Sequence, residues 1–349
     1  MSVALPIAAD GFDRRPDAAA SITGPRDIAA VQTLRISVTD RCNFRCVYCM
    51  PEDKIDWVPR DTLLSFEEIL TVARAARRLG VGGFKITGGE PLVRHDLPRL
   101  VGMLKQIDGA PEVSMTTNGS LLASYAKALR DAGLDRLTVS LDTLDAEKFR
   151  RITRGAMLDR VWEGIAAAQA VGLDHLKINC VTMRGINDDE FADFAALTLK
   201  QKITIRFIEY MPLGRTALGG DYEQRFIDEA EIRRRITERF GPLLETAQDA
   251  GHGPAEVWRL KGALGKIGFI SAMSKPFCRT CNRLRLTAEG QLRSCLFDGG
   301  EVELRPILRG AGRRAGLHDA LCEAFVRCVA FKPEVHSYLG NRQMSQIGG

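Results

Sequence analysis

Short runs rich in β-branched residues alternate with longer amphipathic stretches between residues 34 and 210. The runs are LRISV (34–38), GFKIT (83–87), VSMTT (113–117), RLTVSL (136–141), LKINCVTM (176–183) and ITIRFIEY (203–210). In the stretches between them, apolar residues recur every three or four positions. FEEILTVARAARRLG, for example, follows the capping residue Ser65 and stops at Gly80. This alternation predicts six consecutive units of a β-strand and an α-helix.

Residues with unusual chemistry all follow the predicted strands. They are a first group of three cysteines, then GGEP (88–91), TTNG (116–119), SLD (140–142) and EYM (209–211). Parallel strands joined by helices either open into a doubly wound sheet or curl toward a barrel, and both place function at the carboxyl ends of the strands. We predict an α/β fold, an incomplete, TIM-like (β/α)6 barrel, with its chemistry on one rim.

A Gly-rich segment, PLGRTALGGD (212–221), is typical of a connection and divides the chain. We therefore assign residues 31–211 to the barrel and 212–349 to a smaller C-terminal α+β domain. The smaller domain contains a charged helical stretch near 228–240, the strand-like runs EVWRL and KIGFISA, and a closing helix near 317–331. Residues 1–30 are expected to form a loose leader, because their acidic residues are unusual for an import peptide.

Composition narrows the class of protein. With 349 residues, 45% hydrophobic and 27% charged, the chain resembles a folded globular protein. The net charge of +5 suits an anionic small molecule but is too small to indicate a nucleic acid. No apolar run reaches the roughly 18 residues that cross a bilayer. We expect a cytoplasmic protein without membrane or nucleic-acid partners, whose nine cysteines stay reduced unless metals bind them.

The first cysteine group consists of Cys42, Cys46 and Cys49, three thiols within eight residues. One loop with this spacing can wrap a 4Fe-4S cluster, which usually takes four cysteines. Three cysteines leave one iron open to a non-protein ligand, and an open coordination position is typical of reactive metal sites. Structural zinc is the alternative, although it normally takes a fourth protein ligand.

The stretch LRISVTDRCNFRCVYCM resembles the signature of radical S-adenosylmethionine enzymes, and the GGEP segment resembles their second motif. In that superfamily the open iron binds the amino and carboxylate groups of S-adenosylmethionine, whose reductive cleavage yields a 5′-deoxyadenosyl radical. The resemblance implies that S-adenosylmethionine contacts Tyr48, Gly89, Ser140 and Met211. Glycines at positions 88 and 89 would let the methionine end of the cofactor approach the backbone.

The second cysteine group consists of Cys278, Cys281 and Cys295. The segment NRLRLTAEGQLRS between the last two predicts a β-hairpin with its turn near residues 288–290. Since residues 281 and 295 are equidistant from Ala288, we expect their side chains to lie near each other across the hairpin. Three thiols would again converge, and structural zinc, with a histidine or Cys322 as the fourth ligand, is the alternative.

Two groups of three cysteines, one in each half of the chain, resemble the GTP 3′,8-cyclase family of molybdenum cofactor biosynthesis. The resemblance runs from about Leu34 to the C-terminus. It implies two 4Fe-4S clusters, the second binding guanine, and conversion of GTP to (8S)-3′,8-cyclo-7,8-dihydroguanosine 5′-triphosphate. It also implies an electron donor and a cyclic pyranopterin monophosphate synthase as functional partners, and leaves a homodimer open.

Two other functions compete with this interpretation. One is a peptide-modifying radical enzyme, whose C-terminal region would normally hold more than three clustered cysteines. The other is a non-catalytic, zinc-stabilised RNA-binding module, which would need exposed aromatics among its basic residues, whereas aromatics make up only 7% of this chain.

Basic residues in or beside the predicted strands suit a triphosphate, since arginine matches the geometry of phosphate oxygens. Charged side chains there usually face a functional cavity rather than an apolar core. The resemblance implies GTP contacts for Arg35, Lys85, Thr116, Lys177, Arg283, Leu284 and Arg285, and Arg206 is added for its place in the sixth strand. A terminal Gly-Gly reaches the active site in that family, so Gly348 and Gly349, together with Arg35, are expected to assist the reaction.

Overall fold

The computed structural model describes residues 25–53, 55–220, 222–246, 253–297, 300–310, 316–337, 340 and 342–348. Residues 1–24 of the expected leader, and Gly349, lie outside these ranges. All six predicted strands are present, each within one residue of its expected ends. They are β1 (Thr33–Ser37), β2 (Gly83–Thr87), β3 (Glu112–Thr117), β4 (Arg136–Ser140), β5 (Leu176–Thr182) and β6 (Thr204–Glu209).

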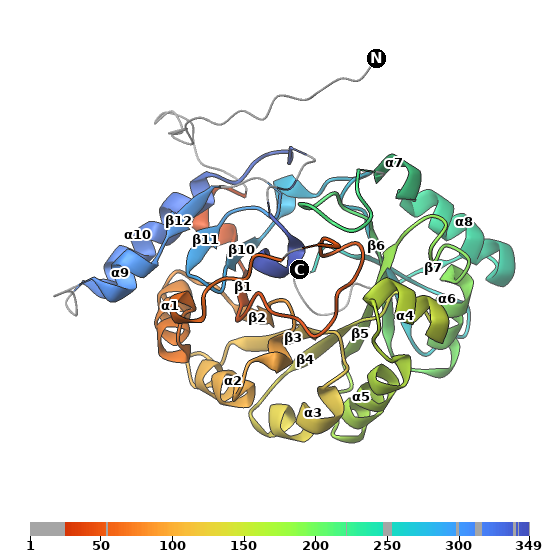
Figure 1. The fold of residues 1–349 in the computed structure, drawn as a ribbon, viewed down its shortest axis with the longest axis horizontal. Helices are drawn as coiled ribbons and strands as arrows, with labels where there is room; N and C mark the ends of the chain where they lie inside the picture. The colour runs from red at the N-terminus through yellow and green to blue at the C-terminus, as the bar shows by residue number, and fades with distance from the viewer. Residues whose placement is uncertain are drawn as a thin grey trace, which may run out of the picture.

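Helices connect these strands and lie on the outside of the curved sheet (Figure 1). They are α1 (Phe66–Arg78), α2 (Leu97–Lys105), α3 (Leu122–Asp131), α4 (Ala146–Thr153), α5 (Leu158–Ala170) and α6 (Phe191–Lys200). At the start of α1 the Ser65 hydroxyl accepts from the Glu68 amide, and the Glu68 carboxylate accepts from the Ser65 amide. This capping box satisfies two orphan donors and fixes the first turn. The expected helix start after Ser65 is confirmed.

The C-terminal part supplies shorter elements. The strands are β7 (Leu244–Glu245), β8 (Glu256–Arg259), β9 (Lys266–Ile270), β10 (Arg283–Leu286), β11 (Gln291–Arg293) and β12 (Glu301–Glu303). The helices are α7 (Tyr222–Arg225), α8 (Glu229–Phe240), α9 (Arg305–Arg309), α10 (Leu317–Ala330) and α11 (Met344–Ile347). Short 3₁₀ helices span Ile28–Ala30, Arg60–Thr62, Pro91–Val93 and Cys278–Thr280. Within the described ranges, no helix is both long and apolar enough to cross a membrane.

The C-terminal strands complete the sheet of the barrel instead of forming a sheet of their own. The strand order is β12-β11-β10-β1-β2-β3-β4-β5-β6-β9-β8-β7, with β10 parallel to β1 and β9 parallel to β6. Six parallel strands alone would leave two edges with unpaired backbone groups, and these strands cover both edges. One hydrophobic core runs from Val31 to Val329 across both parts of the chain. The domain boundary at residues 211 and 212 stays a prediction.

Candidate active site

The inner face of the sheet is basic. On β1 and β2, Leu34 and Phe84 are buried in the hydrophobic core, whereas Arg35 and Lys85 pair with each other on the opposite face. Residues paired across neighbouring strands share a face, so the register extends this face around the sheet. The predicted substrate residues that it brings together are Arg35, Lys85, Thr116, Lys177, Arg206, Arg283 and Arg285. We call them the basic face.

Leu284 differs from the other predicted GTP residues. Its side chain is fully buried and belongs to the hydrophobic core on the outer face of β10. A contact between Leu284 and a ligand on the inner face can therefore come only from the main chain.

Two cations of the basic face donate hydrogen bonds to the same hydroxyl group. Lys85 Nζ donates to Thr138 Oγ1 over 3.3 Å, and Arg206 Nη2 donates to the same oxygen over 3.1 Å. A threonine hydroxyl has two lone pairs and can accept both bonds. Sequence reasoning missed Thr138, because one threonine in a strand carries no signal until its neighbours are known.

The basic face is electrostatically strained. Burial lowers the pKa of Arg35 well below its usual value, and the charges of Arg285, Arg283 and Arg206 lower it further. Burial, with the nearby Arg283, likewise lowers the pKa of Arg285 to about 9. Among the described residues, the Nε of Arg35 has no hydrogen-bond partner. Buried cations held together in this way favour binding of a multiply charged anion.

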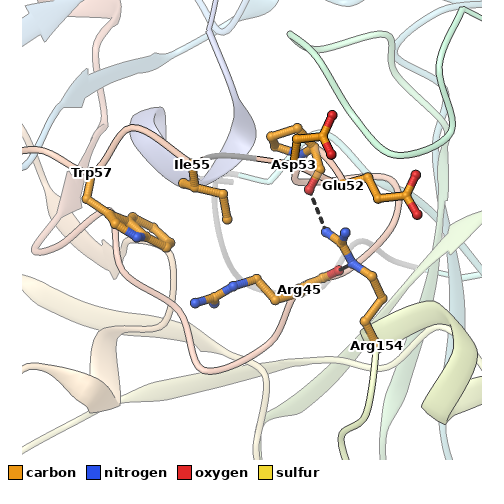
Figure 2. A pocket seen from close by; sticks show the side chains of 7 residues that line it. Arg45, Glu52, Asp53, Ile55, Trp57 and Arg154 are labelled. Atoms are coloured by element: carbon orange, nitrogen blue, oxygen red, sulfur yellow. Dashed lines mark hydrogen bonds between the residues drawn. The ribbon is translucent and has the colours of Figure 1, made fainter.

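The loop that carries the first cysteine group follows β1 and is held by α4 and the residue after it. The Arg45 amide donates to the Thr153 carbonyl over 3.1 Å. The Arg154 guanidinium donates to the carbonyls of Arg45 and Pro51 (Figure 2). Arg154 itself has a left-handed backbone, with a φ of 58°. These bonds connect Arg154 to the middle of the cysteine loop, at Arg45, and to the segment that follows Cys49.

A pocket of about 310 Å³ lies beside this loop (Figure 2). It is lined by Arg45, Pro51, Glu52, Asp53, Ile55, Trp57 and Arg154. The Arg45 guanidinium lies 5.1 Å from the centre of the Trp57 ring, a cation–π contact. Because its lining mixes two arginines with two acids, this pocket lacks the single-sign charge of the basic face.

The three thiols of the first cysteine group are half-buried and influence one another. Burial raises the pKa of Cys42 to about 11. Burial and the Cys42 thiol raise the pKa of Cys49 to about 12. The pKa of Cys46 is raised well above its usual value by burial, by Asp142 and by the other two thiols. Without a positive metal centre the group therefore holds its protons, and a metal would have to displace them.

The glycines of the GGEP segment pack against the cysteine loop. A Cβ at Gly88 would lie 2.5 Å from the Thr39 carbonyl oxygen, and one at Gly89 would lie 2.4 Å from that of Arg41. The chain's own backbone therefore already requires glycine at both positions, and the approach of a cofactor to them stays a prediction. The next residue, Glu90, is fully buried and accepts hydrogen bonds from the Asn118 amide and the Thr117 hydroxyl.

Of the predicted S-adenosylmethionine residues, Gly89, Ser140 and Met211 lie at or just after the carboxyl ends of β2, β4 and β6, whereas Tyr48 lies in the cysteine loop. The Tyr48 hydroxyl donates to Asp142 over 2.8 Å, and Asp142 also accepts from the Val181 amide. Ser140 ends β4, whereas Met211 follows β6 and packs in a small apolar cluster beside Cys295. Asp142 was not assigned a role from the sequence, although it lies in the SLD segment that follows the fourth strand.

The second cysteine group is surrounded by cations. Cys281 ends the 3₁₀ helix, with its amide bonded to the Cys278 carbonyl over 3.1 Å. Lys332 Nζ lies 3.4 Å from the Cys281 sulfur, and the Arg283 guanidinium lies over the Phe277 ring. Burial raises the pKa of Cys281, but the charges of Arg283 and Lys332 outweigh it and bring the pKa down to about 6. Nearby charges thus lower the pKa of Cys281 in the second group, whereas the pKa values of the three cysteines in the first group are raised.

The hairpin in the second cysteine group is present, but its register differs from the expected one. Arg285 pairs with Arg293, and the Thr287 amide donates to the Gln291 carbonyl, so the turn is centred on Glu289 rather than Ala288. Gly290 closes the three-residue turn with a φ of 93°, a conformation that favours glycine. The turn lies at the expected residues 288–290, but the expectation that residues 281 and 295 lie symmetrically about it was wrong, because its centre is Glu289 and not Ala288.

The C-terminal segment returns to the basic face, and Figure 1 shows it inside the ring of strands. Arg285 Nη1 donates to the Gly348 carbonyl over 2.5 Å. A Cβ at Gly348 would lie 2.6 Å from Thr87 Cγ2. At the start of the same turn, the Ser345 amide donates a hydrogen bond to the Cys49 thiol. The tail therefore touches the first cysteine group and the basic face together.

The two cysteine groups suit iron-sulfur clusters by the number of their thiols, three in each group. Within the described residues, no three His, Cys, Asp or Glu side chains form a site for a single metal ion. Each group supplies three thiols, which leaves one iron of a 4Fe-4S cluster for another ligand.

Sequence comparisons place both halves of the chain in known families. Residues 36–198 match the Radical SAM superfamily, and residues 203–338 match the family described as Molybdenum Cofactor Synthesis C. The chain is 48% identical over 324 residues to a protein of Pelotomaculum thermopropionicum named GTP 3′,8-cyclase, covering 91% of this chain and 98% of the relative. A protein of the same name from Heliobacterium modesticaldum is 46% identical over 328 residues, with the same coverage.

Among solved structures, the fold resembles that of SuiB from Streptococcus suis bound to S-adenosylmethionine. The TM-score is 0.57 at 14% identity, over 85% of this chain and 64% of that one. The likeness shows the fold alone. The identity to the curated relatives over nearly the whole chain goes further, and it disfavours the non-catalytic alternative. The protein belongs to the GTP 3′,8-cyclase family of radical S-adenosylmethionine enzymes.

Proposed function

We propose that this chain converts GTP to (8S)-3′,8-cyclo-7,8-dihydroguanosine 5′-triphosphate, the reaction for which its relatives are named, and so begins molybdenum cofactor biosynthesis. The observation that carries the proposal is the basic face. Arg35, Lys85 and Arg285 hold positive charge against one another, with pKa values lowered by burial and mutual repulsion. A triphosphate supplies the opposing charge, and its oxygens suit the forked arginine donors.

The first cysteine group would hold the 4Fe-4S cluster. S-adenosylmethionine would bind beside it, at Tyr48 of the cysteine loop and at Gly89, Ser140 and Met211 near the ends of β2, β4 and β6. When bound, cluster and cofactor supply the radical that removes hydrogen from ribose C3′. The product is an isomer of GTP: a C3′–C8 bond forms, and one electron and one proton added to the base replace the lost hydrogen. The chain itself orients the triphosphate through the basic face and closes that face with the tail at Gly348.

The second cysteine group would hold a second 4Fe-4S cluster whose open iron binds the guanine ring. Cys281 precedes Arg283 by two residues, so a nucleotide with its phosphates on the basic face would extend its base toward this group. A one-electron donor and a cyclic pyranopterin monophosphate synthase that consumes the product belong to the same proposal, as does a cytoplasmic location. Association as a homodimer is a separate proposal, tested by light scattering of the cluster-loaded protein.

The experiment is anaerobic reconstitution with iron and sulfide, followed by reaction with GTP, S-adenosylmethionine and dithionite. We expect about eight irons per chain, equal amounts of 5′-deoxyadenosine and a cyclised isomer of GTP, and little reaction with UTP. Replacing Cys42, Cys46 and Cys49 by Ala should remove about half the iron and all 5′-deoxyadenosine. Stoichiometric zinc without labile sulfide would contradict the proposal.

A further inference from the structure

Lys332 is a buried lysine whose ammonium group contacts a cysteine sulfur. It follows α10 and is 2% exposed. Its ammonium group donates to the Cys281 sulfur over 3.4 Å, to the Arg283 carbonyl over 2.6 Å and to the Ser294 carbonyl over 3.4 Å. An ammonium has three donors, so these contacts use all of them.

The chemistry of the three acceptors indicates which group the positive charge of Lys332 stabilises. Two are neutral carbonyls, and a buried ammonium needs an opposing charge to be tolerated. The Cys281 sulfur is the acceptor that becomes an anion, because metal ligation requires the thiolate. The positive charge of Lys332 therefore suits the thiolate that Cys281 becomes when it binds metal, rather than the neutral thiol.

The same contacts tie the second cysteine group together. The Arg283 carbonyl lies two residues after Cys281, and the Ser294 carbonyl directly precedes Cys295. Arg154 has a corresponding place at the first cysteine group, where its guanidinium donates to main-chain carbonyls. Lys332 differs in that it also reaches a ligand sulfur.

We propose that Lys332 is a positioning residue of the second cluster: its N–H···S bond and positive charge stabilise the Cys281 thiolate and raise the reduction potential of the cluster. The inference rests on the second cluster of the proposed function. Net charge and hydrogen bonds to sulfur are the features that set such potentials, and a nearby cation favours the reduced state. The residue acts on the cluster through Cys281 and not through the substrate.

The test uses the full chain with Cys42, Cys46 and Cys49 changed to Ala, so that the remaining iron signal belongs to the second group. Iron content and the midpoint potential, from an EPR-monitored dithionite titration, are measured for this parent and for Lys332→Met, Lys332→Gln and Lys332→Arg. We expect the neutral variants to lower the reduced-to-oxidised ratio at the parent midpoint at least tenfold, which equals a 59 mV shift for a one-electron couple. Lys332→Arg keeps the charge and should stay within threefold.

Lys275→Met is the matched control, because Lys275 is exposed and its ammonium group pairs with the Glu229 carboxylate instead of a cysteine sulfur. It should leave the potential unchanged. Loss of iron from both neutral variants, with retention in Lys332→Arg, also supports the proposal. An unchanged potential in Lys332→Met with full iron, or an equal defect in Lys332→Arg, overturns it. Zinc without sulfide in the parent would overturn the second cluster and this inference together, whereas a cluster indifferent to Lys332 overturns the inference alone.

Discussion

The guanidinium of Arg285 donates a hydrogen bond to the main-chain carbonyl of Gly348, 63 residues farther along the chain. One residue belongs to the basic face and the other to the C-terminal tail. The bond gives the tail a fixed position without any side chain of its own. It also means that a triphosphate drawn to Arg285 meets the tail at the same place.

Substitution of Gly348 should therefore reduce cyclisation. In Gly348→Ala the new Cβ would meet Thr87 at 2.6 Å, and the φ of 74° would be strained, at a cost of about 1–3 kcal/mol. We expect the tail to leave its position and cyclised product to fall at least tenfold, with iron content and GTP binding nearly unchanged. Deleting residues 348 and 349 should act alike. Gly262→Ala is the control, since Gly262 has a similar φ of 76° and open space around it. Full product yield from the truncated chain would refute the expectation.

Loss of a cation from the basic face should weaken GTP binding selectively. We expect Arg283→Ala and Arg285→Ala each to weaken GTP binding by about 1–3 kcal/mol, the range for a charge-assisted hydrogen bond. S-adenosylmethionine binding should stay nearly intact. Calorimetry with each ligand measures both effects, and Arg309→Ala, which removes an ion pair to Glu68 at the surface, serves as the control. Equal losses of GTP and S-adenosylmethionine binding would show that these arginines do not bind GTP selectively.

Glu90 should make the stability of the metal-free chain depend on pH. Burial raises the pKa of Glu90 to about 7 from its usual 4.5. Between these values the folded chain binds more protons than the unfolded chain, so the free energy of unfolding falls as pH rises from about 4.5 to about 7. Above pH 7 this contribution stays constant. Asp142, whose pKa burial raises to about 6, acts in the same direction.

The comparison of wild type with Glu90→Gln isolates the Glu90 contribution. Relative to this variant, wild type should lose up to about 3 kcal/mol across the window, at 1.36 kcal/mol for each pKa unit. Anaerobic urea titrations at pH 5, 6, 7 and 8 provide the measurement. A constant difference between the two proteins would show that Glu90 titrates at its ordinary pKa.

Arg154 should control retention of the first cluster. Arg154→Ala removes the bonds to the carbonyls of Arg45 and Pro51 and so releases the cysteine loop at two points, one within the group and one after Cys49. We expect faster loss of about half the iron when the reconstituted protein is exposed to a chelator, with the other half lost at the wild-type rate. Arg160→Ala, at an exposed site on α5 paired to Glu163, is the control. Uniform loss of all the iron would point to general destabilisation.

Much of the fold was determined by the sequence itself. All six barrel strands and the capped start of α1 were predicted within one residue, because period-2 and period-3.6 patterns are local and each repeats several times. The basic residues on the strands were also found locally, since alternation places Arg35 and Lys85 opposite the apolar residues beside them. The spacing of the two cysteine groups indicated their chemistry in the same way.

Tertiary structure alone decided which distant segments meet. The local sequence of β9 and β10 does not indicate that they pair with opposite edges of the barrel sheet. Such pairing depends on unpaired backbone groups at the sheet edges, which become available only after the barrel forms. Lys332 is 51 residues from Cys281, and a single lysine after a helix gives no sequence signal. Such contacts arise from the packing of the whole chain. Burial then makes an unpaired charge costly in free energy, so the groups around each buried charge matter.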